Sequence, residues 1–311
     1  MKRQTTNCLL LLAVAAGGLS PSPALAQAAP AAISVTGSPL FAAEPSPELL
    51  ARAQPYHDAY AAEPHDPDRL IWHARFLAYE GKYREAIDVL SAGIERFPKD
   101  ARLRRHRGHR YITLRQFDKA IADFDVAIQL IQGMPNEIEP DGMPNAQNIP
   151  ISTLHGNIYY HKGLAHYLRQ EWEAALQAFE QCRSLKTNDD NLVSATHWIY
   201  MIHRRMGNED AAQQALKPIH EDMQIIENFN YHTACLFYRG ARSLEDVSGQ
   251  SDETPATDAM RYAVANWHAC NGDKEKALQV LQQIVEGEGW ASFGHIAAEV
   301  DLVTAMKAQA D

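Results

Sequence analysis

Four side chains that can carry positive charge, Arg102, Arg105, His106 and His109, are spaced to lie on one face of a helix. Positions i, i+3, i+4 and i+7 of an α-helix point to the same side. Guanidinium groups donate paired hydrogen bonds to carboxylates, so this face is suited to an acidic ligand. The 311-residue chain has a formal net charge of −10. We therefore expect a basic site to be local, and we expect no nucleic-acid partner.

The chain contains 14 histidines, which raises the question of a metal site. Of the histidine pairs close in sequence, only His106 and His109 have useful spacing on one helical face. A zinc site needs about four ligands, and the flanking arginines would repel the cation. The sequence has no phosphate-binding glycine loop, nucleophile elbow or His-Glu-x-x-His motif. We expect no metal, no cofactor and no catalytic residue; an enzyme or metal-dependent protein that uses the histidines is the alternative.

A repeated pattern organises the elements that must position these residues. Residues 81–93 read Gly-x-Tyr-x-x-Ala-x-x-x-Leu-x-x-Gly, and residues 115–127, 34 positions later, read Arg-x-Phe-x-x-Ala-x-x-x-Phe-x-x-Ala. The frame returns from residues 170, 207 and 272. In such a unit the alanine lets two helices approach closely and the next large apolar residue fills the gap between them. The period and pattern resemble the tetratricopeptide repeat (TPR).

This resemblance implies an all-α fold, an α-solenoid of TPR-type helical hairpins with a C-terminal capping helix, over residues 46–311. We place repeats at residues 67–100, 101–134, 156–189, 193–226 and 258–291. Additional helices are expected at 47–62, where Ser46 precedes a proline, at 231–240, and at 293–306 as the cap. The small residue at the close-packing position of the first helix is Ala74, Gly108, Gly163 or Ala265, and Tyr200 breaks this rule in the fourth unit.

Several further stretches resemble a family of exported bacterial TPR proteins that has no assigned activity. They are residues 105–111, 138–142 with Pro144 and Asn145, 225–228, and 290–299. The resemblance supports the fold and export, and it supplies no catalytic residues.

The N-terminus has the pattern of a secretory signal peptide over residues 1–26. Basic Lys2 and Arg3 precede an apolar run, and Ala24-Leu25-Ala26 forms a small-x-small cleavage site before Gln27. We expect a mature protein that begins at Gln27 and is periplasmic or secreted.

Residues 27–45, rich in Ala, Pro and Ser, are expected to form a flexible arm. Once Cys8 leaves with the signal, Cys182, Cys235 and Cys270 remain. They are either three buried small hydrophobic residues or one disulfide with a free thiol.

In a TPR stack the first helix of each hairpin lines the concave surface, so the repeat frame extends the basic face into a groove. The predicted peptide-binding residues are Trp72, Arg75, Arg102, Arg105, His106, His109, Tyr160, His161, His197 and Trp198. We expect a periplasmic protein-interaction scaffold that binds an extended acidic peptide or protein segment. In the alternatives, the arginines pair with acids on neighbouring helices, or the chain is a structural subunit of a cell-envelope complex.

The connection over residues 135–155 is long for a loop inside a repeat array. It carries Glu137, Glu139 and Asp141 and follows the arginine-rich unit. Opened out, its middle reaches about 30 Å from its anchors, far enough to cross the concave mouth. The loop is expected to be a competing acidic lid, one wall of the groove, or only a connector.

Overall fold

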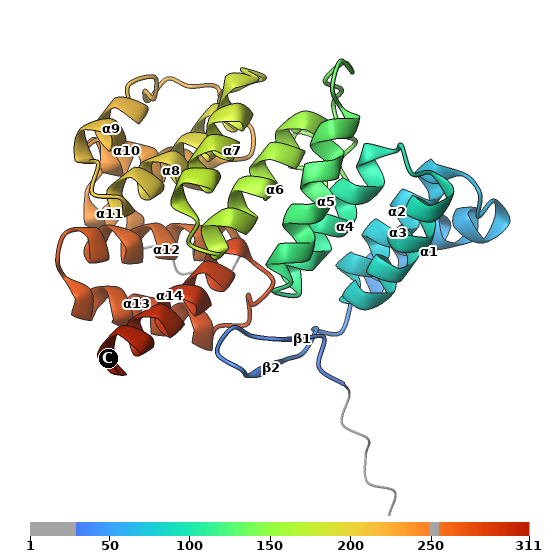
Figure 1. Cartoon of the computed structure of the whole chain (residues 1–311), viewed down its shortest axis with the longest axis horizontal. Helices are drawn as coiled ribbons and strands as arrows, with labels where there is room; N and C mark the ends of the chain where they lie inside the picture. Colours follow the sequence, from blue (N-terminus) through green and yellow to red (C-terminus); the bar gives the residue numbers. More distant parts are fainter. Residues whose placement is uncertain (1–28, 249–254, 311) are drawn as a thin grey trace, which may run out of the picture.

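The computed structural model describes residues 29–248 and 255–310, which form a curved stack of helices (Figure 1). The predicted signal peptide and the residue that follows it, Gln27, lie outside the described residues. The fold is an all-α solenoid, as the repeat pattern predicted. Within the described residues, strand structure is limited to a two-stranded hairpin, β1 (Ala32–Ile33) and β2 (Pro39–Leu40), and one isolated bridge.

Each region predicted to be a repeat contains an antiparallel pair of helices. The pairs are α2 (Pro67–Tyr79) with α3 (Tyr83–Arg96), α4 (Ala101–Thr113) with α5 (Phe117–Leu130), α6 (Leu154–Leu168) with α7 (Trp172–Ser184), α8 (Asp189–Arg205) with α9 (Glu209–Ala215), and α12 (Pro255–Cys270) with α13 (Lys274–Glu286). The other helices are α1 (Pro47–Ala62), α10 (Phe229–Tyr238), α11 (Leu244–Ser248) and α14 (Phe293–Ala310). No helix in the described part of the chain has the length and apolar content needed to cross a membrane.

The turn inside every hairpin has the same backbone conformation. One residue has a positive φ in each case: Gly81 (80°), Arg115 (60°), Gln170 (60°), Gly207 (74°) and Gly272 (87°). Glycine adopts this left-handed region without steric cost, whereas other residues are strained there. Arg115 and Gln170 therefore occupy turn positions that favour glycine.

The two helices of a hairpin approach closely at the small residues that the repeat frame identified. A Cβ atom built on Gly108 would lie 2.7 Å from the ring of Phe124, and one on Gly163 would lie 2.8 Å from the ring of Phe179. Both phenylalanines are completely buried. These contacts show that the fold uses the packing expected for TPR-type hairpins.

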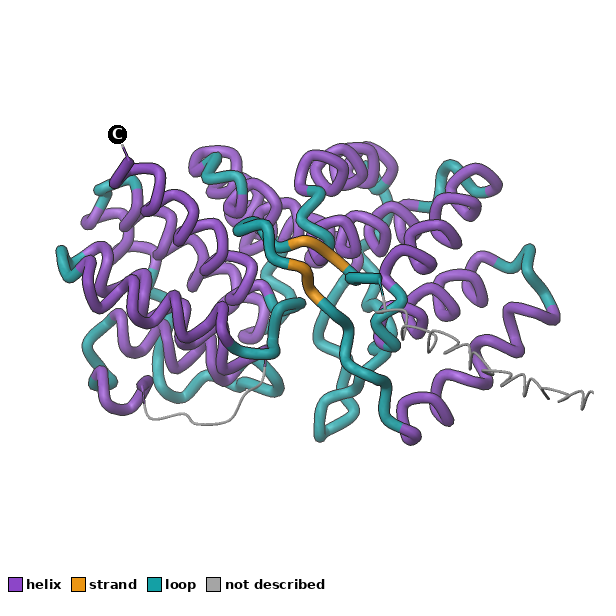
Figure 2. The backbone as a smooth tube through the Cα atoms, turned by 90° about the horizontal axis from the view of Figure 1, so that it is seen from below, coloured by secondary structure: helices purple, strands orange, loops and turns teal. Residues whose placement is uncertain are grey.

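The described part of the N-terminal arm is packed against the C-terminal helices, so the expectation of a flexible arm is wrong there. Ala32 is 2% exposed and packs with Leu114 and Trp290. The amide of Val35 donates to Glu299 Oε2 at 2.9 Å, and Trp290 Nε1 donates to the carbonyl of Phe41 at 2.8 Å. The hairpin thus lies across the middle of the molecule, between the end of α4 and α14 (Figure 2). The sequence did not indicate this because the partners lie up to 264 positions apart.

The three cysteines of the described residues are unpaired. Cys182 and Cys235 are buried and Cys270 is partly buried. Burial raises the pKa of the Cys182 thiol to about 11, despite a hydrogen bond from Asn191 that lowers it. The thiols are therefore protonated packing residues rather than nucleophiles.

Candidate functional site

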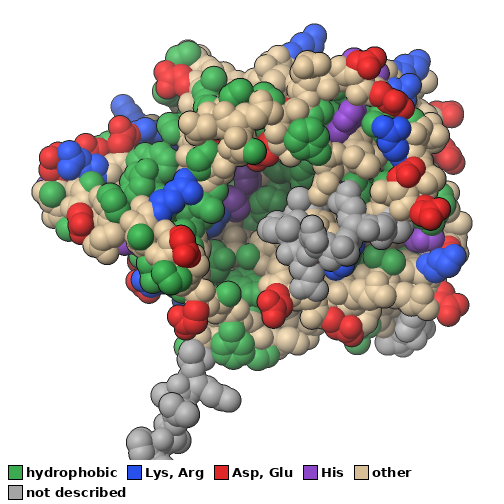
Figure 3. All heavy atoms as spheres, turned by 180° about the vertical axis from the view of Figure 1, so that it is seen from behind, with side chains coloured by type: hydrophobic (Ala, Val, Ile, Leu, Met, Phe, Trp, Pro, Cys, Tyr) green, Lys and Arg blue, Asp and Glu red, His purple; other side chains and the backbone are tan. Residues whose placement is uncertain are grey.

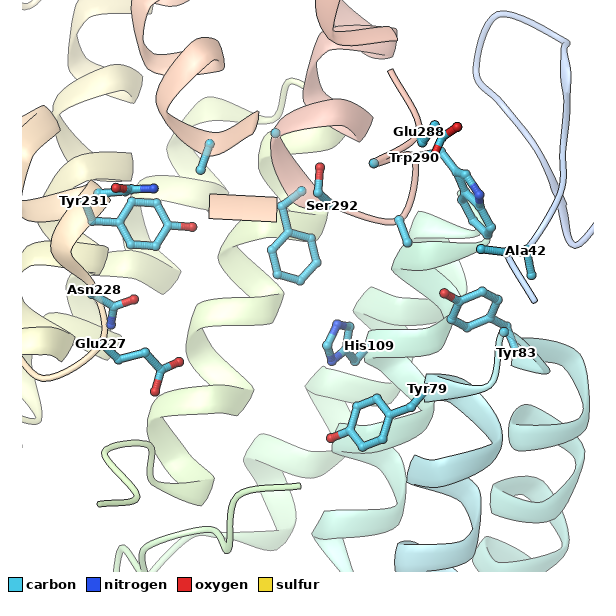
Figure 4. A pocket seen from close by; sticks show the side chains of 18 residues that line it. Ala42, Tyr79, Tyr83, His109, Glu227, Asn228, Tyr231, Glu288, Trp290 and Ser292 are labelled. Atoms are coloured by element: carbon cyan, nitrogen blue, oxygen red, sulfur yellow. The ribbon is translucent and has the colours of Figure 1, made fainter. Parts of the chain in front are cut away.

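A hollow lies on the concave side of the solenoid, and segments from both halves of the chain line it. Its largest cavity has a volume of about 470 Å³. Tyr79, Tyr83 and His109 line one side, and residues 227–231 line the opposite side (Figure 4). Residues 288–294, the loop before α14, close the hollow between them. Figure 3 shows apolar side chains and a histidine gathered in the hollow on this face.

Three smaller cavities continue this one, because they share lining residues with it or with each other. A cavity of about 220 Å³ shares Tyr231 and Phe293 with the largest, and one of about 170 Å³ shares Tyr79 and His109. A fourth, of about 100 Å³, shares Arg105 with the 170 Å³ cavity. We call the four together the central hollow.

Three arginines line the 170 Å³ cavity, which we call the basic sub-pocket. Arg75 donates to the carbonyl of Pro140 at 2.8 Å, and Arg105 forms an ion pair with Glu139 at 3.0 Å. Arg110 makes no ion pair or side-chain hydrogen bond with any residue of the described chain; its guanidinium lies 5.9 Å from the centre of the Tyr83 ring. Burial, with the nearby charge of Arg105, lowers the pKa of Arg110 to about 10, so the side chain is charged at neutral pH.

Glu139 fixes the long loop to α4. Its side chain is 9% exposed and contacts Arg105 and, at 3.4 Å, His106, while Asn157 donates a hydrogen bond to it. Burial alone would raise the pKa of this carboxyl, but the Arg105 guanidinium and the hydrogen bonds hold it well below its usual range. The expected proximity of a loop carboxylate to an arginine of this helix is therefore present for Glu139 with Arg105.

Other contacts also hold the loop in place. The amide of Glu139 donates to the carbonyl of Ser152 at 2.9 Å, and Arg52 of α1 donates to the carbonyl of Gly142 at 2.7 Å. Of the other two acids predicted in the loop, Asp141 is half-buried and lines the basic sub-pocket, whereas Glu137 is exposed. The loop therefore lies along one side of the central hollow.

Two buried carboxylates hold the backbone segments opposite the arginines. Asp190 is completely buried and accepts hydrogen bonds from the amides of Ile226 (2.9 Å), Glu227 (2.9 Å) and Asn228 (2.7 Å). This arrangement places the Glu227 carboxylate in the central hollow, where burial raises its pKa.

Asp258 has the same role for the loop before α14. It accepts a hydrogen bond from Ser292 at 2.7 Å, and Ser292 also accepts one from the amide of His295 in the first turn of α14. Gly289 and Gly294 pack so closely on Asp258 that neither has room for a Cβ atom. The loop is therefore held in one conformation, with Trp290 and Phe293 lining the central hollow.

The histidines of the central hollow are neutral. The rings of His109 and His161 are 4.4 Å apart, and that of Phe293 lies 5.4 Å from His109. Burial, followed by the Arg105 charge, lowers the pKa of His161 to about 3, and burial holds the pKa of His109 well below its ordinary value. Positive charge in the hollow therefore comes from the arginines.

Six of the ten predicted binding residues line the central hollow: Arg75, Arg105, His106, His109, Tyr160 and His161. Trp72 does not: it stacks on Tyr56 of α1 with ring centres 5.0 Å apart and lies under the Arg75 guanidinium at 4.3 Å. The additional helix α1 covers this part of α2, so a ligand in the hollow does not meet Trp72.

The predicted place of Arg102 in the groove is wrong. Its guanidinium pairs with Asp100 at 2.6 Å and with Asp68 at 2.5 Å, outside the cavities. Asp100 is the N-cap of α4 and Asp68 lies in the first turn of α2, so one carboxylate at the start of each helix holds the Arg102 side chain. This is the alternative in which arginines pair with neighbouring acids.

The predicted places of His197 and Trp198 are also wrong. Both lie in the core, 0% and 1% exposed, because α10 and α12 pack against α8. Trp198 nevertheless supports the hollow from behind, since its Nε1 donates to the hydroxyl of Tyr160 at 2.8 Å.

Sequence reasoning from the repeat frame missed Arg110, Tyr79, Tyr83, Tyr231, Trp290 and Phe293. For Arg110, Trp290 and Phe293 the available signal was the resemblance outside the repeat frame, whereas Tyr79, Tyr83 and Tyr231 lie outside those stretches. Residues 105–111, 138–145, 225–228 and 290–294, far apart in sequence, each contribute side chains to the central hollow. In the described residues, no group of three or more His, Cys, Asp or Glu side chains is placed to hold a metal ion.

No family model and no curated protein matches the chain. Among solved structures, it is similar to YrrB, described as a TPR protein with an unusual peptide-binding site, at 16% identity over 82% of this chain and 99% of that one, with a TM-score of 0.43. A TPR protein from Parabacteroides merdae has 17% identity over 81% and 92% of the two chains, with a TM-score of 0.48. The TPR domain of P58(IPK) has 12% identity over 85% and 86%, with a TM-score of 0.25. At these identities the function has to be inferred from the residues of this chain.

Proposed function

We propose that this TPR-type solenoid is an exported protein-interaction scaffold whose central hollow binds an acidic segment of another protein. The observation that carries the proposal is Arg110, a charged guanidinium without an acidic partner in the described chain, beside Arg75 and Arg105. An unpaired guanidinium that is partly withdrawn from water is unfavourable, and a carboxylate from a partner would supply its counter-charge. The formal net charge of −10 makes this local excess of positive charge more significant.

Aromatic side chains around the arginines supply the remaining contact area. Tyr79, Tyr83 and Tyr231 line the 470 Å³ cavity together with Trp290 and Phe293. Aromatic residues of this kind contribute much of the binding free energy at protein interfaces, because they bury a large area at a small cost in side-chain entropy.

Export is part of the proposal and is supported by the signal-peptide pattern of residues 1–26. The measurement is the intact mass of the protein recovered from the periplasmic or culture fraction of the producing cell. A mass that corresponds to a chain starting at Gln27 supports export. Retention of residues 1–26, or recovery only from the cytoplasm, contradicts it.

We further propose that the long loop forms a wall of the site. Glu139 is buried and paired with Arg105, its amide donates to the carbonyl of Ser152, and the Arg52 side chain donates to the carbonyl of Gly142. A displaceable lid would instead make exposed contacts, which are worth about 0–1 kcal/mol each. Neutralising Glu137, Glu139 and Asp141 together distinguishes the two, since a wall predicts weaker ligand binding and a competing lid predicts tighter binding.

The binding proposal is tested by screening a random peptide library at low salt against the wild-type protein. We expect selection of acidic peptides, whose affinity falls with added salt. Arg110→Gln should weaken the binding of the selected peptide by about tenfold or more, because a charge-assisted hydrogen bond is worth about 1.5–3 kcal/mol. Arg102→Gln is the matched control on the same helix and should change affinity by less than about twofold. Selection of basic or purely apolar peptides, unaffected by Arg110→Gln, would contradict the proposal.

A further inference from the structure

We infer that the central hollow is also a small-molecule site, which binds an organic anion with its charged group in the basic sub-pocket and its apolar body in the 470 Å³ cavity. The inference uses the same hollow as the proposed function and goes beyond it, because it requires no protein partner. It rests on the size and enclosure of the hollow, on its charge balance, and on the separation of its charged and apolar parts.

The dimensions suit a small ligand. Sites for small organic molecules usually have volumes of about 300–1,000 Å³. The largest cavity of the central hollow, about 470 Å³, lies in this range. The basic sub-pocket, about 170 Å³, is large enough for one carboxylate or phosphate group. The two cavities share Tyr79 and His109, so one molecule can occupy both.

Several segments other than the concave helices enclose the hollow. Residues 42 and 43 of the N-terminal arm and residues 288–294 line the largest cavity, and Asp141 of the long loop lines the basic sub-pocket. Hydrogen bonds hold these walls: Trp290 donates to the carbonyl of Phe41 at 2.8 Å, and Arg115 donates to the carbonyl of Trp290 at 2.8 Å. Walls held on several sides also make the hollow suitable for a compact ligand.

The charge balance of the basic sub-pocket favours an anion. Arg75, Arg105 and Arg110 contribute three positive charges, and the nearby carboxylates of Glu139 and Asp141 contribute two negative ones. Glu139 is paired with Arg105, and Asp141 accepts a hydrogen bond from the amide of Met143 at 3.0 Å. His106 and His161, which are buried, and His109, which is half-buried, face the sub-pocket and are neutral. Within the basic sub-pocket one positive charge therefore remains in excess; the other carboxylates of the hollow, Glu227 and Glu288, line the neighbouring 470 Å³ cavity.

The 470 Å³ cavity provides the surfaces for an apolar body. The rings of Tyr83 and Trp290 lie edge to face with centres 5.5 Å apart, and the ring of Phe293 stands beside that of His109. At the side opposite His109, Asn228 offers a hydrogen-bonding side chain (Figure 4). These surfaces fit a ligand whose apolar part is a flat ring or an aliphatic chain, with an anionic group at one end and a polar group at the other.

The test measures binding of a panel of free acids to the purified protein by calorimetry and by the change in tryptophan fluorescence. The panel contains 3-phenylpropionate, indole-3-acetate, phenyl phosphate and decanoate, with 3-phenylpropionamide and indole-3-acetamide as neutral counterparts. We expect at least one acid to bind at concentrations up to about 1 mM and its uncharged counterpart, the amide or the alcohol, to bind about tenfold or more weakly. Arg110→Gln should cause a similar loss, Arg110→Lys a smaller one, and Arg102→Gln a change below about twofold. The helical circular dichroism spectrum and melting temperature of each variant show whether it is folded. If Arg110→Gln does not fold, Arg110→Lys still tests the inference.

Three outcomes overturn the inference: no acid in the panel binds, the neutral counterpart binds as tightly as the acid, or affinity is insensitive to both Arg110 variants. The acidic peptide selected from the library is measured with the same variants, which separates this inference from the proposed function. Peptide binding that depends on Arg110, without binding of any small acid, overturns the small-molecule site and leaves the scaffold. Acid binding without peptide binding supports the small-molecule site and removes the acidic-segment proposal.

Discussion

The Nε atom of Arg105 lies 3.0 Å from Oε2 of Glu139, and both side chains are almost completely shielded from solvent, with 12% and 9% exposed. This ion pair joins α4 to the loop over residues 135–155 and forms one edge of the basic sub-pocket. It also explains why Arg105 does not neutralise a ligand as freely as Arg110 would. The ion pair therefore fixes the position of the loop and leaves Arg110, rather than Arg105, free to pair with a ligand.

Replacing Glu139 by glutamine should destabilise the protein by about 3–5 kcal/mol, because it leaves the buried Arg105 without its counter-ion. Because the pKa of Glu139 is lowered in the folded state, the pair contributes fully above the pKa of the unfolded carboxyl and loses its contribution as the pH falls below about 4.3. Urea denaturation at neutral pH measures the loss. The exposed Glu137→Gln is the control and should change stability by less than about 0.5 kcal/mol. Equal effects of the two substitutions would show that the pair is not buried in solution.

Replacing His197 by phenylalanine should reduce the pH dependence of stability. Burial lowers the pKa of His197 to about 3 in the folded state, so below about pH 6.5 the unfolded chain binds a proton that the folded chain does not. Stability should therefore fall by up to about 1.4 kcal/mol per pH unit as the pH drops from 6 to 4, from this residue alone. The difference between the denaturation curves of wild type and variant over this pH range isolates that slope. Parallel curves would mean that His197 is protonated in the folded protein.

The backbone conformation of the turns predicts that two substitutions change the stability of the protein in opposite directions. Gln170 has a φ of 60° in a turn position where three of the other four hairpins have glycine, so Gln170→Gly should stabilise the protein by about 0.5–1 kcal/mol. Gly207 has a φ of 74° and open space around its Cβ position, so Gly207→Ala should cost about 1 kcal/mol through backbone strain alone. Thermal melting of the two variants measures both effects, and a shift of the same sign for both would contradict the assigned turn conformation.

Gly108→Ala should destabilise the hairpin of α4 and α5 by about 1–3 kcal/mol, because the added methyl group would lie 2.7 Å from the ring of Phe124. The double variant Gly108→Ala with Phe124→Leu provides the control. If steric overlap is the cause, the two substitutions should be less destabilising together than the sum of their separate effects. Additive effects would show that the glycine is not there for close packing.

Asp190→Asn should lower stability by about 1–3 kcal/mol, because the side-chain amide turns a donor toward backbone amides that need an acceptor. Since Asp190 holds residues 226–228, ligand affinity at the central hollow should fall as well. Asp189→Asn is the neighbouring control, with a single hydrogen bond to the exposed amide of Gln224. Unchanged affinity in folded Asp190→Asn protein would show that this segment does not need to be fixed for binding.

The sequence determined the local structure because the relevant information is local. A proline after a capping residue starts α1 at Pro47 and α2 at Pro67, and these side-chain caps satisfy amides of the first turn. The 34-residue frame identified the glycines that admit Phe124 and Phe179, since a helix period fixes which residues face the paired helix. It also identified six residues of the central hollow, because the concave face follows from the same period.

Only the tertiary structure decided which of those faces a ligand can reach. The helical period shows on which face of its helix each of Trp198 and Trp72 lies. It does not show that α10 and α12 cover Trp198, or that α1 covers Trp72. The contact of Val35 with Glu299, which holds the arm, is likewise a relation between distant segments, and so is the lack of an ion pair for Arg110 among the described residues. Such contacts depend on the path of the whole solenoid, and no pattern within one repeat encodes them.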